Sequence, residues 1–310
     1  FLILLACSAV GCAEELPGEP VLPLSLRFDW PQEGQVDVEE RSVKRGESAV
    51  MRYRLVWRAD DAGTGFVVSY EDFRFVEVKG IPVEDPRIKA MLPQIEPLAA
   101  AIPELHIDGE GALVEFLGWE ETIESLLSVM ENTGKEAGTW DPTEAQRLRA
   151  IFAQPQARQL LTQGAGQSWD AWVEAWLDLT WQEDPLQEYE GPLPLAMGVF
   201  DGRVEYRVDG SGQHLGEECA WLSQDTTSTF SANQFEAMFG QFEAMGAAPL
   251  HEAIPDRTSV HGHIDGIWET KTLRPHEVRW SKTATMEYDN GESQTQELES
   301  HDYVFTWPAQ

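Results

Sequence analysis

Two histidines separated by one glycine are the residues whose types and spacing best suit metal chemistry. His261 and His263 lie in the segment SVHGHIDGIWE, residues 259–269. Residues two apart on a β-strand point to the same face, so both imidazoles could bind one ion. Zinc needs three or four ligands, and tertiary folding would have to supply the others. A metal site at this pair is therefore an alternative hypothesis, and our main expectation is a protein without a cofactor.

The tetrapeptide His-Ile-Asp-Gly occurs twice, at residues 106–109 and 263–266. Asp-Gly and Asn-Gly are strong hairpin signals, because both central residues of the tight turn need positive φ. We therefore predict turns at both copies, and also at Asp201-Gly202 and Asn290-Gly291. This interpretation explains the repeated tetrapeptide without any chemistry.

Three tryptophans form the most unusual local pattern of the chain. Trp169, Trp172 and Trp176 fall on one face of a predicted helical segment that begins at Ser168. Their indoles could line an apolar pocket for a lipid or a sugar. Buried indoles more often serve as core. Both interpretations stay open, and the three residues are our candidates for ligand binding.

Motifs of common enzyme classes are missing from the sequence. It contains no G-x-S-x-G, no phosphate-binding G-x-x-x-x-G-K-[ST] and no complete H-E-x-x-H. With 54 acidic residues, any pair of carboxylates is uninformative about acid–base catalysis. We therefore expect a protein that is not an enzyme.

The first 13 residues, FLILLACSAVGCA, contain an apolar run followed by small residues and cysteine. Cys12 follows Ala-Val-Gly, and Cys7 follows Leu-Leu-Ala. Both stretches resemble the lipobox of bacterial lipoproteins, with Cys12 preferred and Cys7 as the alternative. The resemblance implies a signal-peptide remnant over 1–12, an acylated cysteine and a Pro-rich tether over 13–21.

Such an anchor would hold the protein on a membrane of the bacterial cell envelope, facing the periplasm or the cell surface. Ordinary signal cleavage near Ala13 is the alternative, and it would give a soluble periplasmic or secreted protein.

The charge of the chain excludes one class of partner. Its 310 residues include 54 acidic and 22 basic side chains, a net charge of -32. Such a chain repels phosphate backbones, so we expect no nucleic-acid partner. Hydrophobic residues make up 42 % of the chain, which is enough for a sizeable core.

The elements that must position these residues follow from hydrophobic periodicity. Near the N-terminus Met51, Tyr53, Leu55 and Trp57 alternate with polar residues, as in a half-buried strand. Residues of about 84–182 show helical spacing, interrupted by a short hairpin near 105–116. From about 195 strands return, except for a predicted helix that carries Gln-Phe-Glu-Ala-Met twice, at 234–238 and 241–245.

We therefore predict an α+β fold with one domain over 22–310. Antiparallel strand blocks at both ends form a curved sheet, and the helical middle packs on one face. The function that fits best is a cell-envelope lipoprotein that binds an apolar small molecule or an envelope protein. The alternatives are a metal-binding protein or metalloenzyme using His261 and His263, and a structural or assembly factor of the envelope.

Overall fold

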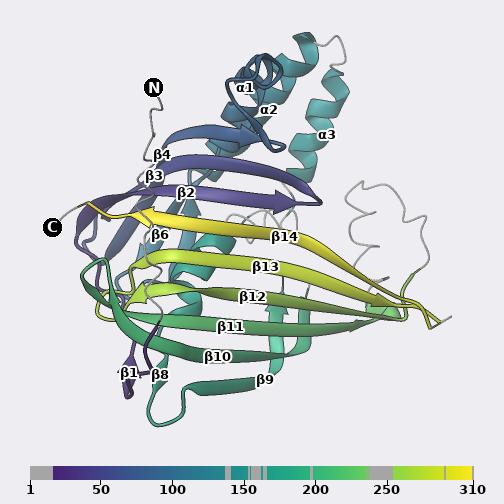
Figure 1. Cartoon of the computed structure of the whole chain (residues 1–310). Coiled ribbons are helices and arrows are strands. Elements are labelled where there is room, and N and C mark those ends of the chain that lie inside the picture. Colours follow the sequence, from purple (N-terminus) through teal and green to yellow (C-terminus); the bar gives the residue numbers. More distant parts are fainter. Residues whose placement is uncertain are drawn as a thin grey trace, which may run out of the picture.

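A computed structural model of the chain describes residues 17–136, 141–152, 154, 162, 166–195, 198–234, 236, 254–289 and 291–308. Strands make up 55 % of the structure and helices 21 %. A single antiparallel sheet of 12 strands dominates it (Figure 1). A separate two-stranded sheet pairs β1 (Leu24–Ser25) with β8 (Thr180–Trp181).

The predicted α+β class with a helical middle is wrong. The middle of the chain contributes strands as well, β6 (Glu104–Asp108) and β7 (Leu113–Leu117), and its helices are few and short. The labelled helices are α1 (Pro86–Ala99), α2 (Trp119–Glu136), α3 (Pro142–Phe152) and the 3₁₀ helix η1 (Glu174–Trp176), and a further helical segment lies over 166–172. Strands of 12 to 17 residues at both ends outweigh them.

The sheet consists of two antiparallel meanders, one from the N-terminal part of the chain and one from the C-terminal part. The first contains β2 (Glu33–Lys44), β3 (Glu47–Ala59) and β4 (Gly65–Val78), with β5 (Ile81–Pro82), β6 and β7 beyond β4. The second contains β9 (Leu186–Leu195), β10 (Gly198–His214), β11 (Glu217–Ser231), β12 (Arg257–Glu269), β13 (Pro275–Glu287) and β14 (Ser293–Thr306). Pairing of β14 with β2 joins the two meanders into one sheet.

Two of the predicted hairpin turns are wrong, because their Asp-Gly pairs lie inside long strands. Gly266 is paired within β12, where an added Cβ would lie 2.1 Å from the carbonyl oxygen of Glu277. Gly202 is paired within β10. Glycine is needed at such positions for close approach of a neighbouring chain, not for a turn. The turn at Gly291, which has a φ of 77°, is confirmed.

The core lies on one face of the sheet. Alternate side chains of the strands point to this inner face, among them Val38, Leu55, Leu222 and Phe305. A helical segment over 166–172 packs its tryptophans against them. Helices α1, α2 and α3 group together next to β4 (Figure 1), with α1 in contact with both β4 and α2.

Candidate functional site: an apolar cavity with a buried carboxylate

A cavity of about 360 Å³ lies between the inner face of the sheet and helix α2. Strands β3 and β4 contribute Tyr53, Tyr70 and Phe73 to its wall, and α2 contributes Ile123 and Leu126. Pockets for small molecules measure about 300–1,000 Å³ and have mostly apolar walls. The cavity is therefore large enough to hold a small organic molecule.

Strand alternation determines which side chains of β3 face the cavity. The predicted shared face of Met51, Tyr53, Leu55 and Trp57 is confirmed, with the first two at the cavity and the last two in the core. Between them, Arg52 points to the opposite face. On the helix side, residues three or four apart lie on one face of α2, because a helix has 3.6 residues per turn. Ile123 and Leu126 therefore both reach the cavity.

Glu40 is the charged residue of the cavity wall, and it is buried, with 9 % of its surface exposed. The hydroxyl of Tyr53 donates a hydrogen bond of 3.1 Å to its Oε2. Its Oε1 lies 2.8 Å from Nδ1 of His301, on β14. A buried carboxylate requires such partners, because a lone charge in an apolar environment is costly.

His301 continues this contact into a chain of charges. Its Nε2 lies 4.0 Å from a carboxylate oxygen of Glu299, and Lys44 lies 3.1 Å from the same oxygen. Burial alone would lower the pKa of His301, but the carboxylates of Glu299 and Glu40 outweigh burial and raise the pKa to about 9. The His301 contact in turn lowers the pKa of Glu299 to about 2, against the effect of burial. At neutral pH an imidazolium therefore lies between two carboxylates.

The tyrosine hydroxyls at this site remain protonated. Burial, with a further contribution from Glu40, raises the pKa of Tyr53 and that of Tyr70. The hydroxyl of Tyr303 forms a 3.1 Å hydrogen bond with that of Ser168, which also lines the cavity. The wall thus combines aromatic and aliphatic surface with one carboxylate and several neutral hydroxyls.

Our sequence-based candidates did not include Glu40 or His301. One signal was present, because Glu40 is in phase with the buried Val36 and Val38 on β2. An acidic residue in phase with buried apolar residues of a strand is expected to be buried, and a buried charge needs a partner. His301 is likewise in phase with the buried Tyr303 and Phe305 on β14. Its contact with Glu40 had no local signal, since the two residues are 261 apart along the chain.

The three tryptophans proposed as ligand contacts lie in the core, with 0 to 1 % of their surfaces exposed. The indole N–H of Trp169 donates to the carbonyl of Gly111, and that of Trp176 donates to the carbonyl of Ala171. Trp172 packs edge-on against Tyr303 and Phe305. None of the three lines the described cavity. The prediction of one helix that carries all three is wrong, because the helical segment ends at residue 172 and Trp176 lies in the 3₁₀ helix η1. The segment with Trp169 and Trp172 reaches the cavity through Ser168.

His261 and His263 lie on the face of β12 that points away from the core, and both contact Asp225. The distances are 3.1 Å for Nε2 of His261 and 2.8 Å for Nδ1 of His263. The second nitrogen of His263 lies 3.3 Å from Asp265, and this carboxylate and Asp225 raise the pKa of His263 to about 9 despite burial. Both nitrogens of His263 therefore contact carboxylates. Among the residues that the structure describes, no three His, Cys, Asp or Glu side chains group as metal ligands.

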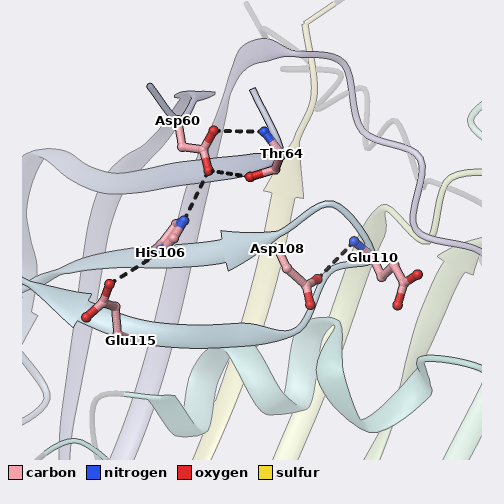
Figure 2. A network of polar contacts seen from close by, with 6 residues as sticks. All are labelled: Asp60, Thr64, His106, Asp108, Glu110 and Glu115. Carbon is pink, nitrogen blue, oxygen red and sulfur yellow. Dashed lines mark hydrogen bonds and ion pairs between the residues drawn. The ribbon is translucent and has the colours of Figure 1, made fainter. Parts of the chain in front are cut away.

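The other His-Ile-Asp-Gly copy forms the polar network of Figure 2. His106, on β6, contacts Asp60 through Nε2 at 3.2 Å and Glu115 through Nδ1 at 3.5 Å. Asp108 accepts hydrogen bonds from the backbone N–H groups of Glu110 and Ala112 and so orders the turn between β6 and β7. The predicted hairpin near 105–116 is confirmed. The contacts of His106 tie the turn at Asp60 to strands β6 and β7, and Asp108 orders its own turn, so both parts of the network serve the structure.

Cys219 is free and buried in the core. Burial, followed by the charges of Glu269 and Glu217, raises the pKa of its thiol to about 12. A thiol in this state is not a nucleophile at neutral pH.

Several predicted features lie outside the described residues. These are the lipobox-like Cys7 and Cys12, the signal-peptide remnant and the repeated helix over 234–245, of which only two residues are described. The described end of the predicted tether, residues 17–21, contacts β10, where Gly18 and Val21 bond to Ser211.

No protein-family model matches the chain, and a search of curated proteins finds no match. No helix in the described part of the chain has both the length and the hydrophobicity needed to cross a membrane.

Proposed function

We propose that this protein binds an apolar small molecule in the cavity between the sheet and α2, without converting it chemically. The cavity itself carries the proposal. A volume of about 360 Å³ with aromatic and aliphatic walls is costly to leave filled with water. An engineered apolar cavity of about 150 Å³ is already enough to bind benzene.

The rigidity of the surroundings supports a binding role. The sheet side of the wall belongs to long paired strands, in which Tyr53 pairs with Val38 of β2 and Tyr70 pairs with Leu55 of β3. The β3–β4 register shifts beside Tyr53, so the pairing with β2 holds this residue in place. Pre-organised walls lower the entropic cost of binding. The resemblance of the first 13 residues to a lipobox extends the proposal to an anchored protein of the bacterial cell envelope that holds its ligand near a membrane.

The proposal can be tested by filling the cavity. Ile123→Trp adds bulk to the cavity wall, whereas Ser128→Trp adds the same side chain at an exposed position of the same helix. We expect the wild-type chain and Ser128→Trp to bind the neutral fluorescent dye Nile red alike. Ile123→Trp should weaken binding by about tenfold or more, because about 1.4 kcal/mol of lost contact suffices for that.

Circular dichroism and urea denaturation would show that both variants fold. Equal dye binding by the two folded variants would refute the assignment of the cavity as the binding site. Absence of dye binding by the wild-type chain would count against the binding function itself.

A further inference from the structure

The charge distribution around the cavity selects among apolar ligands. Among the described residues that line it, Glu40 is the only charged one, and none is Lys, Arg or His. The rest are apolar, aromatic or hydroxyl-bearing. A fatty acid or another anion placed here would bury its charge without a cationic partner and next to a carboxylate, and both effects oppose binding.

The same wall favours binding of a cation. Tyr53, Tyr70, Phe73 and Trp119 supply four aromatic rings to the wall. The negative face of an aromatic ring attracts cations, and the attraction is strongest where water is excluded. A carboxylate beside such rings adds direct charge pairing. This combination is the chemistry that recognises alkylammonium groups.

His301 does not cancel the carboxylate on the cavity side. It is not part of the cavity wall, and it contacts Oε1 of Glu40, whereas Oε2 accepts from the Tyr53 hydroxyl. Each carboxylate oxygen has two lone pairs, so Glu40 keeps acceptor capacity for a ligand. The other ring nitrogen of His301 faces Glu299, and Glu299 pairs with Lys44, so charges of alternating sign follow one another and Glu40 is the member that lines the cavity. The charge nearest to a ligand is therefore negative.

We propose that the ligand is a lipophilic amine or quaternary ammonium compound, with its cationic head at Glu40 and the aromatic rings and its apolar part against Ile123 and Leu126. This inference rests on the proposed binding function and specifies its ligand class. The net charge of -32 also favours a cationic ligand through long-range electrostatics, because it raises the concentration of cations near the protein and lowers that of anions.

The test uses three decyl compounds that share one chain and differ in the charge of the head: decyltrimethylammonium, decanol and decanoate. Each competes with Nile red at neutral pH in about 1 M salt, where the Debye length of about 3 Å suppresses attraction to the protein surface. The cation should displace the dye at an about tenfold lower concentration than the alcohol, and decanoate should be the weakest.

Two matched variants locate the charge effect. Glu40→Gln should abolish the advantage of the cation over decanol and leave dye binding intact. Asp37→Asn makes the same change in net charge on the same strand, but Asp37 lies on the outer face and pairs with Arg54, so the advantage should persist. The ranking on the wild-type chain tests the proposal even if Glu40→Gln fails to fold.

Equal displacement by the cation and the alcohol, or stronger displacement by decanoate, would overturn the ligand class while dye binding still supports the site. A cation advantage that survives Glu40→Gln in a folded protein would also overturn it. Absence of dye binding would refute the proposed function as well, so the two failures are distinguishable.

Discussion

The ion pair of the buried Glu40 with the partly buried His301 predicts a specific loss of stability at alkaline pH. The ordinary pKa of histidine is 6.5, and that of His301 in the folded protein is about 9. One pKa unit corresponds to about 1.4 kcal/mol, so the protonated imidazole contributes about 3 kcal/mol to the free energy of unfolding. Because the folded-state pKa is raised, this contribution is complete below pH 6.5 and is lost as the pH rises through 9.

Urea denaturation of the wild-type chain and of His301→Gln, from about pH 6 to about pH 10, measures this contribution. Glutamine can still bond to Glu40 but cannot carry a charge. The difference in unfolding free energy between the two proteins should shrink by about 3 kcal/mol over this range. His263, with its pKa also raised to about 9, is present in both proteins and cancels. A difference that stays constant with pH would refute the ion pair of Glu40 and His301.

Two further predictions concern the core and the sheet, and both are measured by urea denaturation. Trp172→Ala should lower the free energy of unfolding by about 3–5 kcal/mol, whereas Leu215→Ala, at a side chain that is 79 % exposed, should change it by less than about 0.5 kcal/mol. A small loss for Trp172→Ala would contradict its place in the core. Gly266→Ala should cost about 1–3 kcal/mol, because its Cβ would collide with the carbonyl oxygen of Glu277. Gly262→Ala on the same strand should lower the free energy of unfolding only slightly, because its Cβ would lie 3.9 Å from the nearest atom. Equal losses for the two variants would argue against the register of β12.

Local patterns in the sequence predicted local structure well. The alternation through Tyr53 and Leu55 identified the inner face of β3, and Asn-Gly identified the turn before β14. These features depend on residues close in sequence, whose periodicity follows from strand geometry and turn chemistry.

The errors arose where distant parts of the chain decide the structure. Asp265-Gly266 has the composition of a hairpin turn, yet β12 continues through it, because β11 and β13 pair with it along both sides. Missing this continuity made the strands seem shorter than they are and the helical middle more important. The candidate site in the cavity wall was missed for the same reason. Glu40 contacts His301 because β2 pairs with β14, and no local sequence pattern predicts that pairing.

The most direct test of the account is a crystal structure of the protein with bound decyltrimethylammonium. We predict density for the alkyl chain between Tyr70 and Ile123, with the ammonium nitrogen beside the carboxylate of Glu40. Density for the ligand only on the outer face of the sheet, or the same crystals with the cavity occupied by water alone, would contradict the central claim that this cavity is the binding site.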